Sequence, residues 1–156
     1  MERSETSKAG NEAAKNEPSV KIRERAFAFS LRAVQLFQHL QKQKDGAGWV
    51  IGKQFLRSAC SVGANVEEAQ SAESRADFTH KLGIAQKEAR EALYRLRLLR
   101  ESQIVTKTNL DPLLKETDIL IRVLGSIILT TKNGRKTRNH ARNTQNSELR
   151  TQNSEL

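Results

Sequence analysis

The sequence predicts an all-α protein, an antiparallel up-down-up-down four-helix bundle with disordered N- and C-terminal tails. Aliphatic residues recur at helical spacing in four separate segments, and only 4% of the residues are aromatic, which disfavours an aromatic-rich β-sandwich. Neither of the two prolines, Pro18 and Pro112, needs to lie inside a helix. At 156 residues the chain fits one domain. We therefore predict a disordered arm (1–18), a four-helix bundle (19–131) and a disordered basic tail (132–156).

The first two helices are predicted from apolar series spaced alternately by four and three residues. Between them, glycines at 46 and 48 predict a turn over 45–48, since glycine readily adopts the conformations that end a helix. The second helix is expected to end near Ser71. The inward series are Ile22, Ala26, Phe29, Ala33, Leu36 and Leu40, widened by Phe27, Leu31, Val34 and Phe37, and then Ile51, Phe55, Ala59, Val62, Val66 and Ala69.

The third and fourth helices have recognisable start signals. Ser74 followed by Asp77 resembles a capping box with Asp in place of Glu or Gln, and predicts a helix over 75–102, roughly 40 Å long. Asp111 and Pro112 predict an N-cap and a first-turn proline for the last helix. The apolar series are Phe78, Leu82, Ala85, Ala89, Ala92, Leu96 and Leu99, and then Leu113, Leu120, Leu124 and Ile127, flanked by Leu114, Ile121 and Ile128.

Both ends of the chain lack the residues needed for a core. Residues 1–17 contain no aromatic or branched aliphatic side chain, which predicts a flexible arm. From residue 132 the apolar pattern stops, and the sequence Thr-Gln-Asn-Ser-Glu-Leu occurs at 144–149 and again at 151–156. One leucine in each of two repeats is too little for a coiled coil, so we interpret the tail as a disordered tandem duplication.

Charge and cysteine content narrow the possible partners and the compartment. The net charge is +9, and residues 19–131 contain 18 Lys and Arg against 12 Asp and Glu, which favours polyanionic partners. The single cysteine, Cys60, excludes an intramolecular disulfide and a multi-cysteine zinc site. No stretch approaches the roughly 18 to 20 apolar residues of a membrane-spanning helix, and the N-terminus lacks the apolar region of a signal peptide. These features predict a cytoplasmic protein without a membrane partner.

The sequence contains no recognisable catalytic constellation. His39, His80 and His140 lie in three different segments, and there is no metal-ligand pair of histidines and no Gly-rich phosphate loop. We therefore predict a protein that is not an enzyme, with no cofactor, no metal site and no small-molecule substrate.

The segment 58–64 is rich in small residues, which favours close approach of a neighbouring helix. We interpret Cys60 as a small packing residue rather than a reactive thiol, and Gly63 as a point of close helix contact. A polar stripe adjoins the apolar one on this helix. It suits a solvated helix face or, if buried, a surface with partners such as Lys81 or Arg90. Its members are Ser58, Ser61, Asn65 and Glu68.

The third helix carries an aromatic residue among cations. At 100° per residue, Lys87, Arg90, Tyr94 and Arg97 point away from the core stripe, together with Glu101. An outward aromatic among three cations suits base stacking with phosphate contacts, and it equally suits a subunit interface. The first four are our candidate nucleic-acid or partner contacts, and a lone exposed tyrosine among ordinary surface charges remains the alternative.

The motifs Gln54–Ala69, Ser74, Asp77-Phe78 and Lys81–Ala85 resemble a known family. These are the bacterial four-helix bundle proteins first noticed as products of intervening sequences in large-subunit ribosomal RNA genes. The sequence differs from the commonest family form at Gly63, where that form has proline. The family-motif positions are Arg57, Ser58, Ser61, Ala64, Asn65, Glu68, Asp77 and Phe78.

The resemblance implies a helical bundle that assembles as a ring, typically a homopentamer, without known enzymatic activity. A relative, the accessory protein of diversity-generating retroelements, binds nucleic acid and a reverse transcriptase through a basic surface. The resulting hypothesis is a non-enzymatic homo-oligomeric accessory protein that binds RNA or DNA through a basic surface. The alternative is a protein–protein interaction scaffold with no nucleic-acid role.

Overall fold

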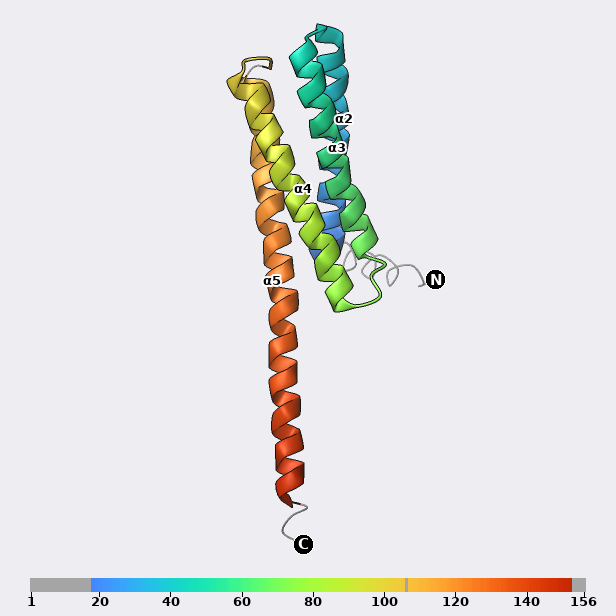
Figure 1. Cartoon of the computed structure of the whole chain (residues 1–156), viewed down its shortest axis with the longest axis vertical. Coiled ribbons are helices and arrows are strands. Elements are labelled where there is room, and N and C mark those ends of the chain that lie inside the picture. Colours follow the sequence, from blue (N-terminus) through green and yellow to red (C-terminus); the bar gives the residue numbers. More distant parts are fainter. Residues whose placement is uncertain (1–17, 106, 153–156) are drawn as a thin grey trace, which may run out of the picture.

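Four helices form an antiparallel bundle in which each helix packs against its neighbours in sequence. The computed structural model describes the backbone of residues 18–105 and 107–152 and the side chains of residues 21–105 and 110–134. α2 also contacts α5, so the four helices close into an up-down-up-down bundle, and within the described residues α2 makes no contact with α4 (Figure 1). The helices are α2 (Pro18–Gln43), α3 (Gly46–Ala69), α4 (Arg75–Glu101) and α5 (Lys107–Gln152).

The core consists of the inward stripes that the sequence predicts. Phe29 of α2 and Phe55 of α3 meet edge to face near its centre, with ring centroids 6.2 Å apart. Thr117 is fully buried between the predicted leucines of α5 and donates a hydrogen bond to the carbonyl oxygen of Leu113 at 2.7 Å. Four residues of the predicted inward series are only partly buried and pack at its edge: Leu36, Ile51, Phe78 and Ile127.

Two residues expected to widen the inward stripe of α2 lie outside the core, so that expectation is wrong for them. Phe27 is 71% exposed and Leu31 is 50% exposed. At 100° per residue, Leu31 lies on the helix face roughly opposite the stripe that contains Phe29, and Phe27 lies close to that opposite face. Neither α3 nor α5, the two helices that α2 contacts, covers this side of it.

The turn between α2 and α3 lies earlier than the glycines predict. Lys44 has the positive φ of 56°, whereas no described glycine has a positive φ. Asp45 caps α3 by accepting a hydrogen bond from the backbone N–H of Gly48 at 2.7 Å. Of the two glycines, Gly48 serves close packing, because a Cβ there would lie 2.8 Å from Cγ2 of Ile104, whereas a Cβ on Gly46 would meet nothing within 4 Å.

The start of α4 is as predicted, whereas α5 starts earlier. The hydroxyl of Ser74 accepts a hydrogen bond from the backbone N–H of Asp77 at 3.0 Å, and α4 begins at the next residue, Arg75. α5 begins at Lys107, so Pro112 lies inside the helix. The preceding turn packs against the core through the buried Leu110, which keeps it helical ahead of the proline.

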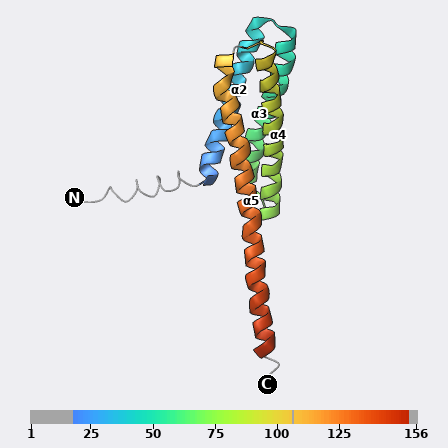
Figure 2. The same ribbon diagram turned by 90° about the vertical axis from the view of Figure 1, so that its left-hand side faces the viewer.

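The C-terminal half of α5 extends beyond the other three helices (Figures 1 and 2). The backbone is helical to Gln152, although the sequence predicts a disordered tail from residue 132. No proline follows Pro112, so no residue of this kind interrupts the helix. The predicted disordered arm lies outside the described residues except for Pro18, which begins α2.

No described helix has the length and apolar character to cross a membrane.

Candidate functional site

The outer face of α4 holds the four residues singled out as candidate contacts. Lys87, Arg90, Tyr94 and Arg97 are all exposed, and the Tyr94 side chain is 61% exposed. They point outward because the residues of α4 at 82, 85, 89, 92, 96 and 99 are all buried. Leu98, one turn after Tyr94, is 38% exposed. The predicted orientation of this face is confirmed.

The cations of this face are free of carboxylate partners. Within the described side chains, Lys87, Arg90 and Arg97 form no ion pair. Two other arginines of the same helix, Arg95 and Arg100, are neutralised. Arg95 lies 3.2 Å from Glu91, and Arg100 lies 2.8 Å from a carboxylate oxygen of Glu101. Three unpaired positive charges therefore surround the exposed tyrosine.

The basic surface continues from α4 onto α5. A hollow of about 440 Å³ lies beside the N-terminal half of α4, and Lys87 of α4 and Lys132 of α5 both line it. Helical periodicity did not predict that Lys87 and Lys132 line one hollow, although the run of cations after residue 131 indicated a basic segment on the last helix. In the sequence, residues 132–142 include Lys132, Arg135, Lys136, Arg138 and Arg142 and no acidic residue.

The family-motif positions lie on α3 and in the first turn of α4. Ser58 is buried and donates a hydrogen bond to the carbonyl oxygen of Gln54 at 3.1 Å. Glu68 accepts a hydrogen bond from Nζ of Lys81 at 2.6 Å, which raises the pKa of the lysine. Lys81 is thus a partner of the polar stripe, in an ion pair that is exposed to solvent. The remaining motif positions are Arg57, 3.9 Å from Glu91; Asn65, bonded to the carbonyl oxygen of Ser61; Ala64, exposed; and Asp77 and Phe78, in the first turn of α4.

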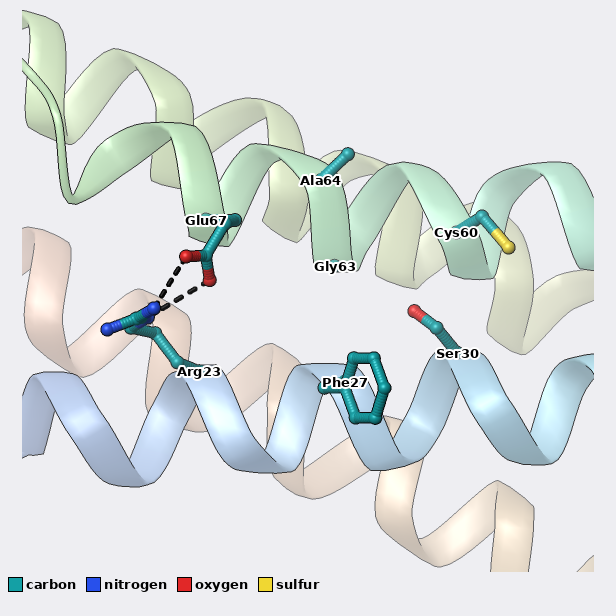
Figure 3. A pocket seen from close by; sticks show the side chains of 7 residues that line it. All are labelled: Arg23, Phe27, Ser30, Cys60, Gly63, Ala64 and Glu67. Atoms are coloured by element: carbon teal, nitrogen blue, oxygen red, sulfur yellow. Dashed lines mark hydrogen bonds and ion pairs between the residues drawn. The ribbon is translucent and has the colours of Figure 1, made fainter. Parts of the chain in front are cut away.

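A groove of about 330 Å³ lies between α2 and α3 on the outside of the bundle (Figure 3). We call this surface the α2/α3 groove. Its lining residues are Arg23, Phe27, Ser30, Cys60, Gly63, Ala64 and Glu67.

Close packing of the two helices shapes the floor of the α2/α3 groove. A Cβ on Gly63 would lie 2.6 Å from Oγ of Ser30, so the predicted role of Gly63 in close helix contact is confirmed. That hydroxyl lies 3.0 Å from the carbonyl oxygen of Ala59 across the helix pair. Cys60 is exposed and lines the groove, at the edge of the contact between the two helices. Partial burial nevertheless raises the pKa of the Cys60 thiol.

An ion pair at one end of the groove neutralises its two charged residues. Arg23 donates two hydrogen bonds to Glu67, from Nη2 at 2.5 Å and from Nε at 3.0 Å. These bonds lower the pKa of the Glu67 carboxyl below its ordinary value and raise that of Arg23. The groove therefore combines apolar walls with no free charge.

The histidines and acidic residues do not gather into a metal centre. Among the described residues, no group of three or more His, Cys, Asp or Glu side chains could hold a metal ion. His39 lies on α2 and His80 on α4, two helices that do not touch, and His140 lies outside the described side chains.

Comparisons with known proteins agree with this architecture. A family model described as the 23S rRNA-intervening sequence protein matches residues 19–126. A crystal structure of a protein with unknown function from the S23 ribosomal protein family of Bacteroides thetaiotaomicron is similar, with a TM-score of 0.68 and 37% sequence identity. The alignment covers 72% of this chain and 98% of that chain. No curated protein matches the sequence.

Proposed function

The chain belongs to the 23S rRNA-intervening sequence protein family, and we propose that it is a non-enzymatic, homo-oligomeric accessory protein that binds nucleic acid. The proposed contact surface is the outer face of α4. The observation that supports it is the set of unpaired cations, Lys87, Arg90 and Arg97, around the exposed ring of Tyr94. Unpaired cations bind phosphates, and an exposed aromatic ring stacks on a base of any sequence.

Assembly increases the total positive charge that is available to bind nucleic acid. Residues 19–131 have six more basic than acidic residues, so a ring of five copies, the typical form implied by the resemblance, would bear about +30 on its bundles. Binding would be independent of sequence and strongly dependent on salt. For three phosphate contacts per chain on a single strand, the slope of log affinity against log salt concentration is about −2.

The test is fluorescence anisotropy of a labelled single-stranded RNA and a matched DNA duplex, at low and moderate salt. We expect binding at low salt that weakens steeply as salt rises. The double substitution Arg90→Glu and Arg97→Glu should reduce the magnitude of the salt slope on the single strand by about 1.4, two of the three contacts, and weaken binding uniformly across sequences. The double substitution Lys21→Glu and Lys42→Glu is the matched control, because it makes the same change of four charge units on α2, whose backbone does not come close to α4. Absence of binding at low salt, or binding that does not respond to salt, would exclude this function.

The alternative is a protein–protein interaction scaffold. The observation that favours it is the apolar pair that Tyr94 forms with the partly exposed Leu98 one turn later, since an exposed aromatic beside an aliphatic residue also suits a protein partner. An oligomer whose mass, measured by light scattering, is unchanged by either nucleic acid at low salt would favour the scaffold.

A further inference from the structure

α2 has a second apolar stripe that its own bundle does not use. Phe27 is 71% exposed and Leu31, one turn later, is 50% exposed. Across the α2/α3 groove, Cys60 and Ala64 of α3 are also exposed. Figure 3 shows the ring of Phe27 on α2 across from Gly63 of α3, with Cys60 further along α3. Contiguous exposed apolar surface of this kind marks interaction sites on soluble proteins.

We propose that the α2/α3 groove is the surface on which a second copy of this chain docks. This inference rests on the homo-oligomeric part of the proposed function and gives it a location. One copy offers both a projecting ring, that of Phe27, and a hollow of about 330 Å³ lined by Cys60, Gly63 and Ala64. Small residues on the α3 wall allow the backbone of a neighbouring helix to come close.

Charge favours a second copy over nucleic acid as the occupant. Among the described residues, the charged ones that line the groove are Arg23 and Glu67, and they are bonded to each other. Two copies, each with a basic bundle, repel least where they meet through a surface without free charge. Contact between copies through the outer face of α4 would instead bring unpaired cations together. A polyanion would find no free cation in the groove to bind.

Cys60 provides a native reporter for this contact. It is the only cysteine of the chain, and it is exposed in the groove. If a second copy covers the groove, maleimide labelling of Cys60 slows as protein concentration rises and the oligomer forms. The measurement is made slightly above neutral pH, because the pKa of the thiol is raised by partial burial.

The test is Phe27→Glu in the full chain, followed by light scattering over a dilution series and by labelling of Cys60. We expect the association constant to fall roughly 30-fold or more, as for a central aromatic anchor, with far-UV circular dichroism unchanged. Labelling of Cys60 should become faster, even though a new carboxylate nearby disfavours the thiolate. Ala64→Arg, on the other helix of the groove, should have the same effects. Tyr94→Ala is the control and should change neither mass nor labelling.

The outcomes separate this inference from the proposed function. A wild-type oligomer whose mass and Cys60 labelling resist both Phe27→Glu and Ala64→Arg would overturn the inference and leave the homo-oligomer in place. A wild-type protein that is monomeric at every concentration, or an oligomer that dissociates only with Tyr94→Ala, would also overturn it. Dissociation by both groove variants in a protein that binds neither RNA nor DNA would support the docking surface and reject the nucleic-acid function.

Discussion

The α2/α3 groove and the outer face of α4 expose the same apolar pattern in different electrostatic surroundings. Each presents an aromatic residue and a leucine one turn later, Phe27 with Leu31 on α2 and Tyr94 with Leu98 on α4. In the groove the nearby charges pair with each other, whereas beside Tyr94 the cations have no partner among the described side chains. We infer that the charges around an exposed apolar pair, more than its exposed area, determine whether that face suits a protein or a nucleic acid.

The largest expected effect is on assembly, and it comes from a lysine substitution on α2 compared with the same substitution on α4. Leu31→Lys adds an unpaired charge to the exposed apolar stripe of α2, one turn after Phe27 of the α2/α3 groove, and we expect the association constant of the oligomer to fall roughly 100-fold, about 2.7 kcal/mol. Leu98→Lys makes the same change on α4 and should leave the oligomer mass unchanged. Sedimentation over a dilution series measures both. Equal loss of assembly in the two variants would show that the faces are not distinct in function.

Removal of the aromatic ring from the α4 face should weaken the binding of single strands and leave the binding of a duplex almost unchanged. Tyr94→Ala loses the stacking surface, and we expect binding to single-stranded RNA to weaken by about 1–3 kcal/mol, while binding to a duplex, whose bases are already stacked, changes little. Tyr94→Phe keeps the ring and should bind as the wild type does. Anisotropy titrations at one low salt concentration measure these affinities. An equal loss for single strand and duplex would mean that the tyrosine does not stack on bases.

Two glycines, one on each face, should respond to alanine with opposite signs. Gly63→Ala places a Cβ 2.6 Å from Oγ of Ser30 and disturbs the hydrogen bond to Ala59, so we expect a loss of about 1 kcal/mol in the free energy of unfolding. A Cβ on Gly83 meets nothing within 4 Å, so Gly83→Ala should stabilise α4 by up to about 1 kcal/mol. Urea denaturation measures both. Stabilisation by Gly63→Ala would show that the two helices separate easily at this point.

Helical periodicity predicted the core better than the surfaces. The inward stripe of α4 and the outward direction of Tyr94 follow from one geometric rule, since a heptad-like series of small and aliphatic residues leaves only one face for the core. The rule does not show which flank of a stripe a neighbour covers, so Phe27 and Leu31 were wrongly expected in the core.

Contacts between residues far apart in the sequence account for the other differences. The hollow shared by Lys87 and Lys132 depends on how α4 and α5 pack, and periodicity does not encode that. The pairing of Arg95 with Glu91 could be predicted from their i,i+4 spacing on one helix. The pairing of Arg23 with Glu67 could not, because it joins two helices and depends on how they pack.

The smallest expected effect concerns the Arg23–Glu67 pair, and its pH dependence tests why the groove is neutral. Because the pKa of folded Glu67 lies below its ordinary value of 4.5, the pair stabilises the protein at neutral pH, and this contribution is lost as pH falls from about that value through the lowered pKa. Both side chains are solvent-accessible, so the stability difference between wild type and Glu67→Gln should be smaller than either glycine effect.

The same substitution has a second consequence for assembly. Glu67→Gln leaves Arg23 as a free cation in the α2/α3 groove, so the oligomer should weaken at neutral pH without a matching loss of helix content. Below the lowered pKa of Glu67 the wild-type groove gains the same positive charge, and the two proteins should then assemble equally well. Light scattering at several pH values measures this convergence. A constant difference between the two proteins at all pH values would show that the shape of Glu67, and not its charge, matters for docking.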